Sequence, residues 1–174
     1  MTRALYVTCC VVAASLAGVP SASAAFVFTV PGGTVDVRTF PGQPERVQSA
    51  VEDSLSYEVD PLPISAQRCP TGRVVITAEK QATLEKAARR GGIKQPKKFG
   101  GLLLRGKVGV DCRIYLNARV LRHLDEAQTC MLVQHELGHA RGLDHTVAGL
   151  MAPTIRFFPD EEHCDWAWSE LLED

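Results

Sequence analysis

Three of the five histidines of this 174-residue chain lie within eleven positions, in the stretch HELGHARGLDH at residues 135–145. His135 and His139 are four residues apart, so on an α-helix both imidazoles can reach the same point in space. Gly142 can adopt the left-handed conformation that ends a helix, which would let His145 turn back toward that point. Three neutral imidazoles with a fourth position open to water form the coordination typical of catalytic zinc.

A carboxylate directly follows the first of these histidines. Glu136 could take a proton from a water molecule at the open position, a role that simple metal binding does not require. We therefore predict one zinc ion bound by the three histidines, with Glu136 as the catalytic base. The two remaining histidines, His123 and His163, have no ligand spacing relative to the cluster, and we expect them to face solvent.

The segment that carries the first two ligands has its own helix signals. Asp125 and Gln128 match a capping box, and Gly142 marks the expected end of the helix. Its apolar residues share the side roughly opposite the histidines: Cys130, Val133, Leu137 and Ala140. We expect this side to pack in the core, so that Cys130 is not a metal ligand.

The extended motif HExxHxxGxxH resembles the signature of the metzincins and is most similar to the matrixin-type secreted metalloproteases. The stretch GLMAP at residues 149–153 resembles the Met-turn of that family, which would place Met151 beneath the metal. The clear resemblance covers about residues 112–154. It implies a zinc metalloendopeptidase that acts on a protein or peptide substrate, with Glu136 passing its proton to the leaving amine.

The chain departs from the matrixins in three respects. His145 and Met151 are only six residues apart, which makes this turn shorter than in typical matrixins. Ala152 stands where many relatives have tyrosine, so any role of that hydroxyl is missing. Matrix metalloproteases also carry a structural zinc and calcium sites. We expect neither here, because only His123 and His163 are left over and the chain has no local Asp/Gly-rich calcium loop.

By the same resemblance, the segment after the Met-turn forms one wall of the S1′ pocket, which receives the side chain following the scissile bond. This segment contains Ile155, Phe157 and Phe158, with Arg156 between them. An apolar wall predicts cleavage before a bulky apolar residue, because burial of such a side chain is favourable. If both phenylalanines pack inward instead, Arg156 would favour an acidic residue.

The resemblance also implies that an extended substrate pairs with the exposed edge strand of a sheet. Residues 102–105 are the candidate edge. Three successive leucines suit a core strand buried on both faces equally well.

Hydrophobic periodicity predicts the elements that would position the site. We expect strands at residues 34–40, 73–77, 99–105 and 112–117, and a helix at residues 44–57. Together with the resemblance this gives an α/β (α+β) zincin-like fold, in which a twisted mixed sheet of four to five strands packs on helices, with the metal helix below the sheet. Residues 25–174 would form a single catalytic domain and a monomer. Its upper subdomain would span residues 25–142, and a small lower one, residues 143–174, would end in a helix.

The first 24 residues have the pattern of a secretory signal peptide. Arg3 precedes an apolar run from residue 4 to about residue 19, and Ala22-Ser23-Ala24 matches an A-x-A cleavage site. We therefore expect a secreted, extracellular protein. The alternative of a membrane anchor is less favoured because the run is short, and we expect no stable membrane insertion after cleavage.

Cleavage would leave four cysteines, and an even count in an exported chain favours two disulfides among three possible pairings. We favour Cys69–Cys112 and Cys130–Cys164. Cys69 also lies in an Arg-Cys-Pro stretch that is similar to the inhibitory cysteine motif of matrixin propeptides. A disulfide is the better interpretation, because we expect no room for a propeptide before the first predicted strand.

The formal net charge is −1, but residues 86–107 contain eight lysines and arginines and no acidic residue. A basic stretch could bind acidic polymers. Because this one is interrupted by glycine and proline and lacks interleaved aromatic residues, we interpret it as a solvated loop and expect no nucleic-acid partner. Two alternatives to a protease remain: a zinc-binding module with weak or lost catalysis, and a secreted interaction domain whose histidines are incidental.

Overall fold

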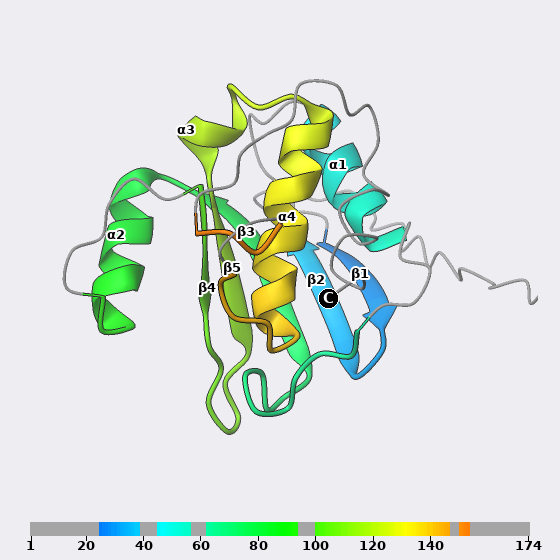
Figure 1. Cartoon of the computed structure of the whole chain (residues 1–174), viewed down its shortest axis with the longest axis vertical. Coiled ribbons are helices and arrows are strands. Elements are labelled where there is room, and N and C mark those ends of the chain that lie inside the picture. Colours follow the sequence, from blue (N-terminus) through cyan, green and yellow to red (C-terminus); the bar gives the residue numbers. More distant parts are fainter. Residues whose placement is uncertain (1–24, 39–44, 57–61, 94–99, 147–149, 154–174) are drawn as a thin grey trace, which may run out of the picture.

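The computed structural model of the chain describes residues 25–38, 45–56, 62–93, 100–146 and 150–153. Within them, helices pack on one five-stranded mixed sheet in an α/β arrangement (Figure 1). Several predictions fall outside the described residues: the signal peptide, the helix at the end of the lower subdomain, and the residues Ile155, Phe157, Phe158, His163 and Cys164.

The strands are β1 (Ala25–Val30), β2 (Gly33–Arg38), β3 (Arg73–Glu79), β4 (Gly101–Leu104) and β5 (Cys112–Asn117). Their order in the sheet is β1-β2-β3-β5-β4. β2, β3 and β5 run parallel, whereas β1 pairs with β2, and β4 with β5, in antiparallel fashion. The prediction of a mixed sheet of four to five strands is confirmed, and β1 is an element that the sequence analysis did not predict.

The helices are α1 (Glu45–Ser56), α2 (Gln81–Arg90), α3 (Ala118–Leu121) and α4 (Glu126–Ala140). α1 and α4 lie side by side over one face of the sheet (Figure 1). α4 is the helix that was predicted to carry the metal ligands, and it packs on one face of the sheet, as expected. No helix within the described ranges is long and apolar enough to cross a membrane.

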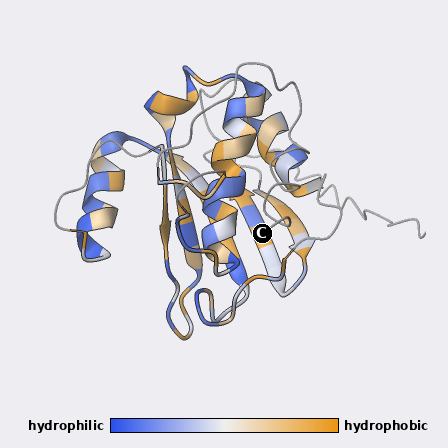
Figure 2. Cartoon of the chain, in the orientation of Figure 1, coloured by the Kyte–Doolittle hydropathy of each residue, from blue (hydrophilic) through white to orange (hydrophobic). Residues whose placement is uncertain are grey.

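α2 corrects the interpretation of the basic stretch as a loop, because residues 86–90 are helical. Its buried residues, Leu84, Ala87 and Ala88, recur at helical spacing, and the basic side chains between them are exposed. Figure 2 shows this mixed hydropathy along the helix. The stretch therefore begins as an amphipathic helix with a solvated basic side.

The alternation of side chains along the strands separates two apolar clusters on the two faces of the sheet. The larger cluster joins one face of all five strands to α1 and α4, and Ile76, Ile114 and Leu137 are fully buried in it. The smaller cluster joins Leu102 of β4 to α2. The sheet is thus covered on both faces at its β4 edge, which is the edge nearest the histidines of α4.

β4 lies at the edge of the sheet as predicted, with β5 as its neighbour in the described structure. Its leucines are also partly covered on both faces of the sheet. The alternative interpretation of this segment, a strand that is buried on both faces, therefore describes its packing. The Asn117 N–H donates to the Gly100 carbonyl over 2.8 Å, so these two residues form a hydrogen-bonded pair. Along an antiparallel ladder such pairs alternate with pairs that share no backbone hydrogen bond, and Gly101 and Leu103 belong to the second kind. Gly101 and Leu103 therefore direct their backbone groups away from β5.

The predicted disulfide between Cys69 and Cys112 is confirmed, with the two Cα atoms 5.4 Å apart. It joins the segment before β3 to the start of β5, and Cys69 is fully buried. Cys130 is also in a disulfide. Because Cys164 lies outside the described residues, its pairing with Cys130 stays a prediction.

We expect replacement of both Cys69 and Cys112 by serine to lower the free energy of unfolding by about 4 kcal/mol. The disulfide spans 43 residues of sequence, and opening it restores the entropy of that loop in the unfolded chain. Urea unfolding of the two proteins measures the difference. A loss below about 1 kcal/mol would show that the pair contributes little to stability.

Candidate metal centre

The ends of α4 are fixed by the residues that the sequence analysis singled out. The Asp125 carboxylate accepts a hydrogen bond from the Gln128 N–H over 2.8 Å, and the Gln128 side chain accepts one from the Asp125 N–H over 3.1 Å. At the other end Gly142 has a φ of +104°, which is the left-handed region that favours glycine. The Leu143 N–H then bonds back to the Gly138 carbonyl over 3.0 Å. The capping box and the glycine stop are both confirmed.

α4 is buried on more sides than the sequence pattern suggested. Cys130, Val133, Leu137 and Ala140 are buried as expected, and so is the opposite side, including Leu132, His135 and Glu136. α1 and strands β4 and β5 pack against the helix, and Leu150 and Met151 lie against it as well. His135 and Glu136 therefore sit inside the protein, where electrostatic interactions are strong.

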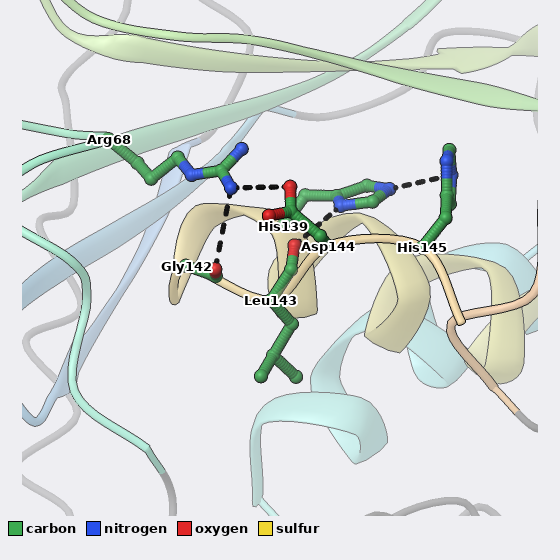
Figure 3. A network of polar contacts seen from close by, with 6 residues as sticks. All are labelled: Arg68, His139, Gly142, Leu143, Asp144 and His145. Atoms are coloured by element: carbon green, nitrogen blue, oxygen red, sulfur yellow. Dashed lines mark hydrogen bonds and ion pairs between the residues drawn. The ribbon is translucent and has the colours of Figure 1, made fainter.

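The three predicted ligands come together. One ring nitrogen from each of His135, His139 and His145 lies within 4.8 Å of the others, and the group could hold a metal ion. The Nε2 atoms of His139 and His145 are 3.1 Å apart (Figure 3). His135 is buried and His145 is exposed, so the cluster extends from the interior to the surface. His123, in contrast, is exposed and lies apart from this group, as predicted.

Backbone carbonyls fix the orientation of the first two rings. The Nδ1 atom of His135 lies 2.7 Å from the Leu150 carbonyl oxygen, and that of His139 lies 2.9 Å from the Leu143 carbonyl oxygen. Since a carbonyl can only accept, both Nδ1 atoms carry the proton, which leaves the Nε2 atoms as lone-pair donors. This outer hydrogen bond is typical of metal-binding histidines.

Burial keeps these imidazoles neutral. It lowers the pKa of His135 to about 4, and it also lowers the pKa of His139. A neutral ring is the form that binds a metal. Three imidazoles suit zinc, copper, iron or nickel, so the donor set alone does not choose the ion.

Glu136 is a buried carboxyl group in the same cleft, with 4 % of its surface exposed. Desolvation raises its pKa to about 8, against the opposing effect of a hydrogen bond from the Leu103 backbone. Its Oε2 atom has no hydrogen-bond partner in the described structure. Without a cation nearby, the carboxyl group therefore keeps its proton at neutral pH, and one of its two oxygens is buried without a partner.

Two glycines that the sequence analysis did not single out make this packing possible. A Cβ atom on Gly101 would lie 2.6 Å from Oε1 of Glu136, and one on Gly138 would lie 2.5 Å from Sδ of Met151. Gly138 lies within the last turn of α4, where glycine still lowers stability relative to other residues. A glycine inside a predicted helix was the signal that another segment packs closely against α4.

Met151 is buried, with 1 % of its surface exposed. Its carbonyl accepts a hydrogen bond from the Thr146 N–H over 3.1 Å. The carbonyl of the preceding residue, Leu150, contacts His135. The short separation of His145 and Met151 is therefore compatible with contact of Leu150 and Met151 with α4.

A cleft of about 790 Å³ extends from the histidines along β4. Its apolar lining includes Val120, Leu124, Leu132 and Pro153, and two arginines, Arg68 and Arg105, line it as well. The sequence analysis had placed Arg105 in the candidate edge and Pro153 in the Met-turn stretch, but it identified none of the other four as part of the site. These four come from separate segments without a motif, so only the fold brings them together.

Comparison of the chain with known protein families, characterised proteins and solved structures found no match. Its function is therefore argued from the chemistry of this site.

The raised pKa of Glu136 predicts a pH dependence of the metal-free protein. Between about pH 4.5 and pH 8 the folded chain keeps a proton on Glu136 that the unfolded chain releases, so this group lowers stability as the pH rises. Glutamine at this position cannot ionise. In the presence of a chelator, the Glu136→Gln variant should become more stable than the original protein by a few kcal/mol between pH 5 and pH 8.

Denaturant unfolding of both proteins at several pH values measures this difference in stability. Because the two proteins differ only at residue 136, the contributions of all other titrating groups cancel in the difference. A difference that does not change with pH would contradict the burial of an ionisable Glu136.

Proposed function

We propose that the chain is a secreted zinc-dependent metalloendopeptidase of the metzincin type, with a catalytic zinc on His135, His139 and His145 and Glu136 as general base. The observation that supports this most is the buried Glu136 carboxyl, whose unpartnered oxygen shares a cleft with the three histidines. Desolvation of a carboxyl group is unfavourable, and strongly perturbed groups of this kind concentrate at functional sites.

The number of ligands favours catalysis over a structural metal. Only three candidate ligand side chains meet in the part of the chain that the structure describes. Structural zinc sites usually have four protein ligands, whereas catalytic sites keep one position for water or substrate. A zinc-binding module without catalysis would have no use for Glu136.

When bound, the ion would polarise the scissile carbonyl and lower the pKa of the attacking water. The three imidazoles would hold the ion in place. Two of these rings, His135 and His139, are oriented by the carbonyls of Leu150 and Leu143, which contact their Nδ1 atoms. Glu136 would accept the proton of the attacking water and return it to the leaving amine. A positive charge nearby would also lower the pKa of Glu136 and favour the carboxylate form that this step requires.

The substrate side of the proposal concerns β4. An extended peptide can pair with an exposed edge strand, and Gly101 and Leu103 direct backbone groups away from β5. The Leu103 N–H bonds to Glu136, so the groups of Gly101 and the Leu103 carbonyl would be the ones that pair with the peptide. The same strand lines the cleft that contains the histidines and Glu136. The apolar walls of this cleft, such as Leu124 and Leu132, would accept an apolar side chain of the peptide. Ile155, Phe157 and Phe158 stay predicted parts of the S1′ pocket.

We expect the purified mature protein to hold one zinc ion, and the His139→Ala variant to lose it together with peptidase activity. His123→Ala is the matched control, because His123 is an exposed histidine outside the cluster. Elemental analysis after gel filtration measures the stoichiometry. Two tightly bound ions, or none, would contradict the ligand assignment.

We expect Glu136→Gln to keep the zinc and to reduce turnover of unfolded casein by roughly 10² to 10⁴-fold, the usual scale for the loss of a general base. Mass spectrometry of the new peptide ends, with and without chelator, identifies cleavage that depends on the metal. A protein that binds zinc but cleaves no unfolded substrate would favour the alternative of a binding module.

A substitution outside the chemistry provides a second test of the Glu136 position. Gly101→Ala should also retain zinc and lower turnover, because the new methyl group displaces the Glu136 side chain. Unchanged turnover in this variant would indicate that the carboxyl group need not lie where the structure places it.

A further inference from the structure

The third histidine differs from the other two in how it is held. His135 and His139 lie on a helix, and their Nδ1 atoms bond to backbone carbonyls. His145 lies beyond the end of α4 and is exposed. Its place relative to the other rings therefore depends on the conformation of residues 141–144.

Arg68 reaches this segment from another part of the chain. Its Nη2 atom lies 2.6 Å from Oδ1 of Asp144, the residue before His145, and 3.4 Å from the Gly142 carbonyl oxygen (Figure 3). One guanidinium group thus contacts both the glycine at which the chain leaves α4 and the residue next to the ligand. The Arg68 side chain is only 13 % exposed, whereas Asp144 is 82 % exposed, so Arg68 approaches this surface segment from the protein side.

The segment that carries Arg68 is itself anchored on both sides. The adjacent residue, Cys69, is joined to β5 by the disulfide with Cys112. The Ser65 N–H donates to the carbonyl of Ala140, the last residue of α4, over 3.1 Å. The guanidinium therefore projects from a support that is fixed to both the sheet and the metal helix.

We propose that Arg68 is a positioning residue that holds residues 142–144 so that His145 can complete the metal site. The inference rests on the metal site proposed above. Arg68 would act through Asp144 and the Gly142 carbonyl and would not touch the metal or the substrate. Outer residues that orient a metal ligand typically change metal affinity by 10- to 100-fold when they are replaced.

The sign of the effect separates positioning from simple electrostatics. Arg68 is a cation close enough to lower the pKa of His139. If its charge were all that mattered, its removal would make the site bind a metal cation more tightly. Positioning predicts the opposite change for the same substitution.

The test measures the dissociation constant for Zn²⁺ by competition with a chromophoric chelator, in the full-length mature protein with its disulfides intact. We expect Arg68→Met to raise this constant about 10- to 100-fold. Arg105→Met is the matched control, because Arg105 lines the same cleft and is close enough to influence Asp144 electrostatically. It should leave the constant unchanged or lower it.

Two further measurements distinguish positioning from general loss of structure. Asp144→Asn changes an exposed side chain and should fold normally, yet it should also weaken Zn²⁺ binding. The double variant should bind no more weakly than Arg68→Met within about threefold, because both changes break the same contact. The visible absorption of bound Co²⁺, which reports the number and arrangement of ligands, should change in both single variants and not in Arg105→Met.

Unchanged or tighter Zn²⁺ binding by Arg68→Met, fully additive losses, or an unaltered Co²⁺ spectrum would overturn the role of Arg68. These results are distinct from failure of the metal site itself, in which case the original protein would bind no Zn²⁺. They are also independent of peptidase activity, which none of these measurements uses.

Discussion

An α-helix can bring two imidazoles to one point when they are four residues apart, but a third ligand has to come from chain that leaves the helix and turns back. In this protein the reversal occurs at Gly142, whose φ of +104° few other residues adopt readily. The carbonyl of Leu143 then orients His139, and the carbonyl of Leu150 orients His135. Described residues that follow α4 thus supply one candidate ligand and orient the other two.

The reversal needs space, and glycine provides it. A Cβ atom on Gly138 would overlap the end of the Met151 side chain, and one on Gly101 would overlap the Glu136 side chain, so the two glycines leave room for these side chains in their present positions. Each of these contacts joins an irregular segment or an edge strand to the middle of a buried helix. The interior of the site is therefore specified as much by absent side chains as by the polar residues that would do the chemistry.

The parts of the structure that could be predicted from sequence are those with short-range signals. The capping box at Asp125, the end of α4 at Gly142 and the convergence of the histidines all follow from spacing within about twenty residues. β1 was missed although its apolar residues are followed by Pro31 and Gly32, a turn signal. α2 was not predicted, because the basic residues of this region were interpreted as part of a solvated loop although Leu84 and Ala88 have helical spacing. Contacts such as Arg68 with Asp144 join distant segments, and no periodicity encodes them.

The hydrogen bond between Leu103 and Glu136 has a further consequence for the behaviour of the protein in solution. β4 is a leucine-rich strand at the edge of a sheet, and unprotected edges of this kind can pair with other chains and aggregate. The Glu136 carboxyl takes up the backbone donor of Leu103, one of the groups that point away from the sheet. A second strand that paired along the whole of β4 would have to break this hydrogen bond. The buried Glu136 would therefore also help to keep the folded protein from associating with itself.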